Sequence, residues 1–175
     1  MIENSVLVVH GGIGTGLWST PGSLRPDIDW LNSKASLRPI TCTDPSSKPP
    51  AFAFRWTHLH NIVWSDPEAD PGSSATPSEW RPHFLPNAQR GSGDIKMFNA
   101  ALTKSFCERN HISMIIRSHE VKMGGYELQH NGLLCTVFSA RNYAHAMQND
   151  AGLVLLQPDD RGRVHCKFKT LKHLE

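Results

Sequence analysis

Two short aliphatic runs, far apart in the chain, have the pattern of strands that are buried on both faces. The first covers residues 6–9 and the second residues 113–116, and each is followed by a histidine, His10 or His119. Unbroken apolar runs of this kind are typical of strands in a covered sheet. Side chains at the carboxyl ends of central strands lie at the edge where α/β proteins build their sites. We therefore expect the two imidazoles to face one another, where they can share a metal ion.

The alternative is that each histidine merely ends a strand, because most histidines in soluble domains bind no metal. Gly11 and Gly12 follow His10 and favour a site, since a backbone without Cβ atoms can approach an ion or a phosphate closely. If His10 and His119 bind one ion, their ring centroids should lie within about 8 Å, because each ligating nitrogen sits about 2.0–2.2 Å from that ion.

The same pattern predicts a helix over residues 95–109, with Asp94 as its N-cap and its end at Asn110. Its apolar residues recur at helical spacing, at Ile95, Phe98, Leu102 and Phe106. A strand is expected directly after it, over residues 112–116. A shorter helix is expected over residues 27–35.

Two hairpins are expected near the C-terminus. Residues 125–129 and 133–138 flank a turn that contains Asn131-Gly132, the strongest short hairpin signal. Residues 152–157 and 163–170 flank a second turn. A strand, a helix and then several strands indicate a mixed α/β or α+β fold with the helix covering the sheet.

The middle of the chain differs from the rest in composition. Residues 14–89 hold all but one of the twelve prolines and all five tryptophans. Proline at this density interrupts helices and strands, which predicts a loop-rich segment. The tryptophans indicate that these loops still pack on something, and Trp64 is expected in the core.

Composition narrows the function classes. The 175 residues suit one domain, and 39% hydrophobic and 19% charged residues are ordinary for a soluble protein. A net charge of +2 without a dense basic run gives no reason to expect nucleic acid or membrane as the main partner. Neither a secretory signal nor a membrane span is expected. The four scattered cysteines favour reduced thiols and a cytoplasmic or nuclear location.

These segments, in this order, resemble a known family. The chain is similar to the C-terminal half of the catalytic domain of serine/threonine protein phosphatases of the phosphoprotein phosphatase type, which are calcineurin-like metallophosphoesterases. The strings that carry the resemblance are Val9–Ile13, Arg38-Pro39, Val63–Pro67, Gln89–Gly91, Ile116–Glu120, Gly124–Tyr126 and Val137–Tyr143. The resemblance covers nearly the whole chain and is weakest over residues 14–61 and 68–89.

The resemblance implies a role for individual residues. His10 and His119 match two histidine ligands of one metal, and Arg90 matches the arginine that binds the substrate phosphate. A planar guanidinium suits that task because it can hold two phosphate oxygens at once. Tyr143 matches a tyrosine that closes over the site, and Asp66 matches a polar residue that lines it. Taken singly, Arg90 would be read as a surface arginine and Tyr143 as a half-buried aromatic residue.

The resemblance also implies an architecture and a chemistry. Residues 1–175 would form the C-terminal part of one catalytic domain, a partial β-sandwich flanked by helices. The activity would be hydrolysis of phosphoserine and phosphothreonine esters by two metal ions, either manganese or iron with zinc. Phosphoprotein substrates and regulatory subunits would be the partners.

The departures from the family pattern are equally informative. The phosphate-binding arginine of the family normally follows Asn-Asp, whereas Asn87-Ala88-Gln89 precedes Arg90 here, and Arg141 replaces a proline. The motifs of the family's N-terminal half, Asp-x-His, Gly-Asp-x-Val-Asp-Arg-Gly and Gly-Asn-His-Glu, do not occur. Two imidazoles without carboxylates form an incomplete site for a hard divalent ion.

Two interpretations of different classes follow. In the first, the chain is part of a protein phosphatase and has almost no activity alone. In the second, it is a non-catalytic relative that binds phosphoproteins or other subunits. A phosphoesterase for small substrates is a third interpretation, and the order of the protein phosphatase strings counts against it.

Overall fold

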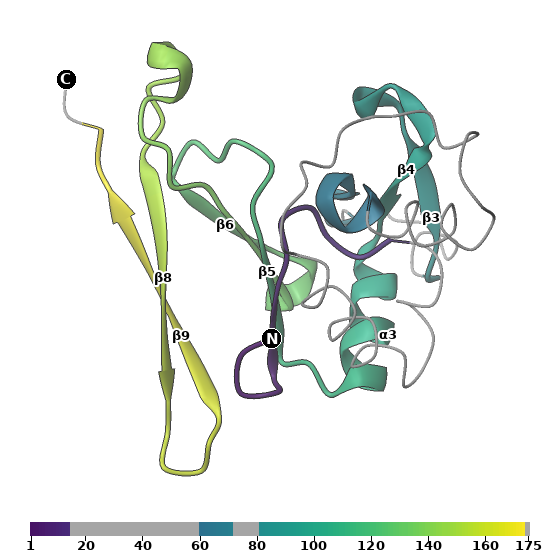
Figure 1. Cartoon of the computed structure of the whole chain (residues 1–175), viewed down its shortest axis with the longest axis vertical. Helices are drawn as coiled ribbons and strands as arrows, with labels where there is room; N and C mark the ends of the chain where they lie inside the picture. The colour runs from purple at the N-terminus through teal and green to yellow at the C-terminus, as the bar shows by residue number, and fades with distance from the viewer. Residues whose placement is uncertain (15–59, 72–80, 174–175) are drawn as a thin grey trace.

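The computed structural model describes residues 1–14, 60–71 and 81–173, which form three small sheets and one long helix (Figure 1). The first sheet has four strands in the order β1-β5-β7-β6. Strands β1, β5 and β7 run parallel to one another, and β6 pairs antiparallel with β7. Their bounds are Val6–Val8 for β1, Met114–Arg117 for β5, Tyr126–Gln129 for β6 and Leu134–Val137 for β7.

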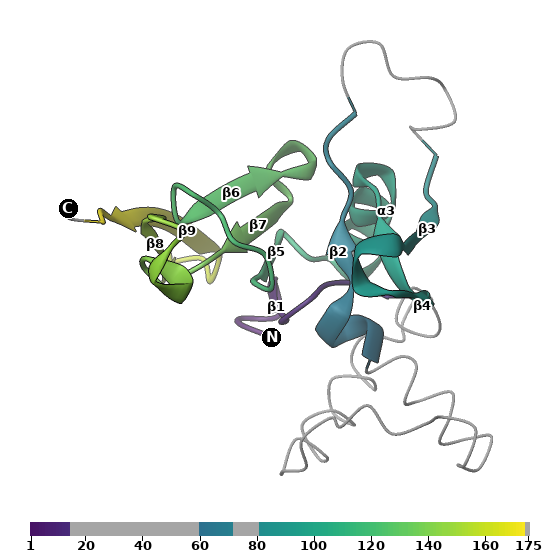
Figure 2. The same cartoon turned by 90° about the horizontal axis from the view of Figure 1, so that it is seen from above.

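The second sheet lies beside the helix α3 (Ala100–Asn110) and has the strand order β2-β4-β3. A short 3₁₀ turn, η3 (Ala88–Arg90), joins β3 to β4. The view from above shows this sheet and α3 on one side of β1 and β5, with β6, β7 and the C-terminal residues 151–171 on the other (Figure 2). The strand bounds are Asp66–Pro67 for β2, Phe84–Asn87 for β3 and Ser92–Phe98 for β4.

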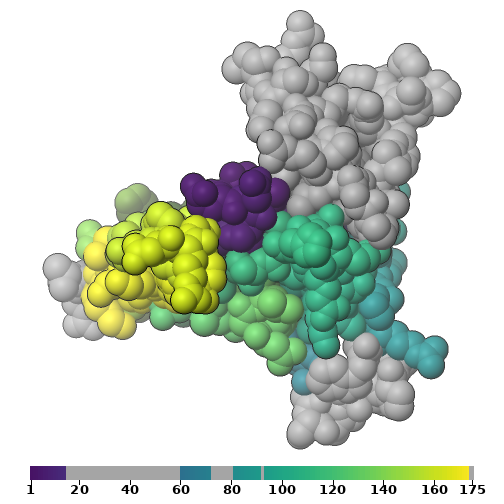
Figure 3. Space-filling model, turned by 90° about the horizontal axis from the view of Figure 1, so that it is seen from below, coloured from purple at the N-terminus to yellow at the C-terminus, as the bar shows by residue number. Residues whose placement is uncertain are grey.

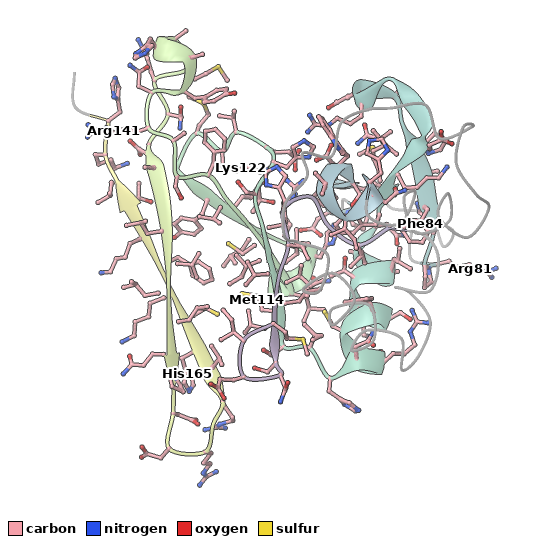
Figure 4. All side chains as sticks on the ribbon, viewed as in Figure 1. Arg81, Phe84, Met114, Lys122, Arg141 and His165 are labelled. Atoms are coloured by element: carbon pink, nitrogen blue, oxygen red, sulfur yellow. The ribbon has the colours of Figure 1, made fainter. Side chains whose placement is uncertain are left out.

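The third sheet is the long antiparallel hairpin of β8 (Ala151–Pro158) and β9 (Val164–Leu171). Its side chains alternate between an exposed face and a face packed on the first sheet, with Phe168 stacked on Tyr126 at a ring separation of 5.2 Å. Met114, the first residue of β5, packs in the apolar layer between this sheet and the hairpin (Figure 4). From below, the N-terminal residues are seated between the hairpin and the segment that carries α3 (Figure 3).

The main core lies between the first sheet, α3 and β4. One face of the sheet contributes to it, and the opposite face packs on the hairpin. The first sheet is therefore covered on both sides, which agrees with its aliphatic strands. The buried apolar residues of this core are Leu7, Ile13, Ile62, Phe98, Leu102, Phe106, Cys107, Ile112, Ile115 and Leu134.

The structure confirms both predicted hairpins, the strand before His10 and the strand before His119, and it confirms the mixed α/β class. The strand β5 begins two residues later than predicted, at Met114. In the described part of the chain β5 is the one strand paired with β1, apart from a bridge between Ile2 and Val6, and Val8 is 47% exposed, so complete burial of β1 was wrong. The predicted helix at residues 27–35 lies outside the described residues.

The predicted start of the long helix was wrong by five residues. Residues 92–98 form β4, and the helix begins at Ala100 with Asn99 as its N-cap. Asn99 Oδ1 accepts a hydrogen bond from the backbone of Leu102. Ile95 and Phe98 are buried, but as strand residues, because pairing of β4 with β2 and β3 overrides a spacing that also fits a helix.

The loop-rich prediction needs a similar correction within residues 81–89. Phe84–Asn87 form the edge strand β3, although Pro86 is among them. Proline is tolerated at an edge or a bulge, and the register of β3 shifts between Pro86 and Asn87. Trp64 was expected in the core but is 38% exposed. None of the helices in the described ranges is long and apolar enough to cross a membrane.

Candidate functional site

The two predicted histidines meet at the carboxyl ends of neighbouring parallel strands. His10 follows β1 and His119 follows β5, and Val8 is paired with Ile116 in the register between them. The backbone of Ser118 donates to the carbonyl of His10 at 3.0 Å. The ring centroids lie 5.1 Å apart with the planes tilted by 47°. This confirms the predicted convergence, because parallel neighbours bring their ends to one edge of the sheet.

His119 is held in an unusual conformation beside Asp66. Its φ of 71° lies in the left-handed region, which side-chain-bearing residues rarely adopt and which clusters at functional sites. Its Nδ1 is buried and 3.2 Å from Asp66 Oδ1, but the alignment is not that of a hydrogen bond. The rings of Trp64 and His119 meet edge to face, with their centroids 5.1 Å apart. The nitrogen is thus left without a hydrogen-bond partner.

The imidazole of His10 is favoured in its neutral form. Partial burial lowers its pKa, and the neighbouring positive groups His119, Arg117 and Arg90 lower it further, while Asp66 acts in the opposite direction. A metal ligand must be neutral imidazole, so this environment suits coordination.

Asp66 is the carboxylate at the centre of the site. It is the first residue of β2, and its side chain is 5% exposed. Its Oδ2 accepts hydrogen bonds from Arg90 Nε at 2.7 Å and Asn87 Nδ2 at 2.8 Å, and its Oδ1 accepts from Arg117 Nη2 at 2.7 Å. Burial raises the pKa of Asp66, but the adjacent His119 imidazole and the hydrogen bonds from Arg90, Asn87 and Arg117 outweigh it and hold the pKa well below its ordinary value.

Arg90 ends the turn η3 and reaches back toward the histidines. Gly91 follows it with a φ of 79°, which lets the chain turn into β4. The guanidinium forks onto both oxygens of Asp66, with the second contact from Nη2 at 3.2 Å. The same Nη2 donates to the carbonyl of His119 at 3.4 Å. Arg90 therefore lies beside the histidine pair with its orientation fixed by Asp66.

Arg117 is a site residue that the sequence pattern did not predict. It is the last residue of β5, and its side chain is fully buried. It donates to the carboxylates of Asp66 and Glu120 and to two backbone carbonyls, those of Gly11 and Ser65. One feature of the sequence could have indicated it: a charged residue ends an apolar strand. A guanidinium buried at such a position must be paired with acceptors.

The glycines after His10 have a different reason from the predicted one. A Cβ on Gly11 would lie 2.5 Å from the backbone of Val63, and one on Gly12 would lie 2.3 Å from the ring of Phe98. Both amides donate to the carbonyl of Ile62. The close approach at Gly11 and Gly12 is therefore to protein atoms of the helical segment at residues 60–64 and of β4.

Tyr143 lies in another part of the molecule than the residues above. It begins the 3₁₀ turn η5 (Tyr143–His145), which Figure 1 shows at the upper end of β8. The side chain is 50% exposed, and its ring packs edge-on against Phe138 at 5.3 Å. Its backbone donates to Asn149 Oδ1. These contacts orient Tyr143 within its own loop and do not bring it into the Asp66 cluster.

The cluster fits an ion only in part. Around Asp66, the buried polar atoms without a hydrogen-bond partner are His119 Nδ1, Asn87 Oδ1 and Ser65 Oγ. Buried polar atoms without a protein partner are uncommon, and here three of them lie around one carboxylate. Within residues 1–14, 60–71 and 81–173, however, no three His, Cys, Asp or Glu side chains are placed to hold one metal. The two imidazoles therefore supply two nitrogen ligands. Both oxygens of Asp66 accept hydrogen bonds from arginines and so do not complete the site.

Comparisons with known proteins agree on one group. The chain is 33% identical over 157 residues to serine/threonine-protein phosphatase rdgC of Drosophila melanogaster, which covers 89% of this chain and 21% of rdgC. It is 33% identical over 172 residues to human serine/threonine-protein phosphatase 5, which covers 98% of this chain and 28% of that protein. No family model matches the chain.

A solved structure extends the likeness to the fold. A protein serine/threonine phosphatase of Saccharomyces cerevisiae, described as similar to human phosphatase PP5, superposes with a TM-score of 0.59 at 28% identity. The match covers 98% of this chain and 45% of that one. The chain is homologous to the serine/threonine protein phosphatases. As a phosphatase homologue it has the mixed α/β fold of a part of their catalytic domain, and it spans 21–28% of the curated relatives named above.

Proposed function

We propose that this chain supplies the second half of the active site of a protein phosphatase that hydrolyses phosphoserine and phosphothreonine esters. The observation that carries the proposal is the convergence of His10, His119 and Arg90 around Asp66, in a chain homologous to protein phosphatases. Those relatives act on phosphoproteins, as their names state. Phosphoproteins and regulatory subunits are the partners that the proposal assigns to this chain.

The residues divide into three tasks. His10 and His119 would bind one ion of a dinuclear centre, the kind of centre that such phosphatases generally use, filled by manganese or by iron with zinc. The bound ions would activate a water for in-line attack on phosphorus. Arg90 would bind the phosphate oxygens, and Asp66 keeps its guanidinium turned toward the histidines. Tyr143, which the resemblance places over the site, packs on Phe138 within its own loop and is assigned no contact with the phosphate.

The isolated chain should have almost no activity, because two imidazoles form half of such a centre. Fusing the N-terminal half of a relative upstream of Met1 should restore Mn²⁺-dependent hydrolysis of a phosphopeptide. In that fusion, Arg90→Ala should lower kcat/KM by about 10²-fold or more, since charge-clamping groups contribute on this scale. The assay is phosphate release at saturating Mn²⁺, with the isolated chain beside the fusion.

The matched control is Arg81→Ala. Arg81 is exposed and points outward at the far edge of the molecule (Figure 4), so its loss should leave the rate unchanged. Equal losses from the two substitutions would remove Arg90 from the phosphate-binding role. If residues 1–175 alone hydrolysed the phosphopeptide at a rate typical of the family, this would contradict the proposal that the chain supplies only part of the active site.

A non-catalytic binding module is the second candidate. The observation that favours it is that, among the described residues of the site, two imidazoles meet but no third His, Cys, Asp or Glu side chain is placed to complete a metal site. A fusion that stays inactive while the isolated chain binds phosphoproteins through Arg90 would support this candidate.

A further inference from the structure

We propose that Arg117 is a positioning residue: its buried guanidinium fixes the two histidine-bearing strand ends and the carboxylate that orients Arg90. The inference rests on the proposed function for its meaning, and on the geometry of the chain alone for its contacts. No similarity to other proteins assigns this task to Arg117.

The first observation is the number of segments that one side chain joins. Arg117 Nε donates to the carbonyl of Gly11, next to His10. Its Nη2 donates to the carbonyl of Ser65 at 3.1 Å and to Asp66 Oδ1 at 2.7 Å. Its Nη1 donates to Glu120 Oε2 at 2.6 Å. The guanidinium thereby ties together the residues that follow β1, the start of β2 and the residues that follow β5.

The second observation concerns His119, which lies between the strand end and Glu120. The ion pair of Arg117 with Glu120 spans three residues and encloses His119, whose φ is 71°. A left-handed residue of this type is costly and persists only where surrounding contacts determine it. The Arg117–Glu120 pair is such a contact, and it holds the imidazole on the side that faces His10.

The third observation is the charge balance. Two guanidinium groups, Arg117 and Arg90, meet two carboxylates, Asp66 and Glu120. Asp66 bonds to both arginines, with Oδ1 facing Arg117 and Oδ2 facing Arg90 Nε. Loss of Arg117 would leave Oδ1 without its shortest donor, and the carboxylate could then rotate and carry Arg90 with it.

Only arginine can make this set of contacts. Its planar fork carries five N–H donors in fixed directions, whereas a lysine ammonium has three donors at a single point. Arg117→Lys keeps the charge but cannot reach Gly11, Ser65, Asp66 and Glu120 together. The expected defect is therefore misplacement of His10, His119 and Arg90 in a chain that is still folded.

The test uses residues 1–175 with and without Arg117→Lys and follows two readouts besides melting temperature. One is the nuclear Overhauser contact between the rings of His10 and His119, whose centroids lie 5.1 Å apart. The other is binding of inorganic phosphate by calorimetry. We expect loss of the ring contact and phosphate binding weakened at least about tenfold, the equivalent of one charge-assisted hydrogen bond.

Two controls keep the outcomes separate. Arg109→Lys alters an exposed arginine of α3 that bonds to its own helix at Ser105, and it should change neither readout. Arg90→Lys should weaken phosphate binding and leave the ring contact intact. A lower melting temperature for Arg117→Lys, with both readouts unchanged, would make Arg117 a structural residue only and overturn the proposal.

A second variant covers the case in which Arg117→Lys does not fold. Glu120 is 30% exposed, so Glu120→Gln removes one countercharge without emptying a buried position. It should weaken the ring contact and lower phosphate affinity a few-fold, and unchanged values would overturn the proposal. If the unaltered chain binds no phosphate, the proposed function loses support, while the ring contact still decides the role of Arg117.

Discussion

At the scale of single residues, the carboxylate of Asp66 holds the two arginines of the site in position. Its carboxylate is 5% exposed and bonds to Arg90, Arg117 and Asn87. Breaking a buried ion pair by removing one partner is costly, because the other charge stays buried without compensation. Asp66 therefore links the stability of the chain to the arrangement of its candidate site.

Asp66→Asn should lower the free energy of unfolding by about 3 kcal/mol at pH 7, which urea denaturation can measure. The pKa of Asp66 is depressed, so the folded state binds fewer protons than the unfolded state. Its stabilising effect is therefore present above the ordinary pKa of 3.8 and lost as the pH falls toward the folded value.

The gap between the unaltered chain and Asp66→Asn should thus be constant from pH 7 to pH 5 and narrow below pH 4. Asp160→Asn, at an exposed position of the hairpin turn, is the control and should cost nothing measurable. A gap that is unchanged at pH 3 would contradict the assigned charge pairing.

At the scale of elements, the boundary between β4 and α3 shows how one side chain decides where a helix begins. Asn99 closes the strand and opens the helix, accepting from the amide of Leu102 and donating to the carbonyl of Arg81. It thereby also attaches α3 to the residues that lead into β3. The predicted cap, Asp94, is instead an exposed residue within β4.

Asn99→Ala should lower the free energy of unfolding by about 1–2 kcal/mol, the usual cost of losing an N-cap. The measurement is urea denaturation followed by the helical circular dichroism signal. Asp94→Ala is the matched control, and its effect should be clearly smaller. The opposite order would place the helix start back at residue 94.

At the scale of the whole molecule, a contact between two glycines seats the β8–β9 hairpin against the first sheet. A Cβ on Gly152 would lie 1.9 Å from the carbonyl oxygen of Gly125, and a Cβ on Gly125 would lie 2.5 Å from the backbone of Ala151. The backbone of Gly152 donates to the carbonyl of Phe138 at 2.8 Å. Backbone thus meets backbone here, with no room for a side chain.

Gly152→Ala should destabilise the chain by about 1–3 kcal/mol, because a forced methyl group displaces one layer from the other. Gly124→Ala is the control, since a Cβ there meets nothing within 4 Å. Thermal unfolding of the two variants gives the comparison. Equal melting temperatures for both would mean that the hairpin is not seated through this contact.

The sequence by itself determined the two hairpins, the strands before His10 and His119, and the meeting of these histidines. The runs of residues that flank each turn, with Asn131-Gly132 in one of them, predict the hairpins, because these signals act between near neighbours. Two aliphatic strands that end in His10 and His119 predict the 5.1 Å approach of their rings, since parallel neighbours share an edge. The resemblance to phosphatases rests on the same short strings.

Tertiary structure alone decided the partners of these residues. Ile95 and Phe98 fit a helix by spacing, and only pairing with β2 and β3 makes them part of a strand. Gly11 is required by the backbone of Val63, a contact that no local pattern contains. Arg117 gains its importance from acceptors in three separate segments, at Gly11, at Ser65 and Asp66, and at Glu120. Contacts between distant segments depend on how the layers pack, which periodicity along the chain does not encode.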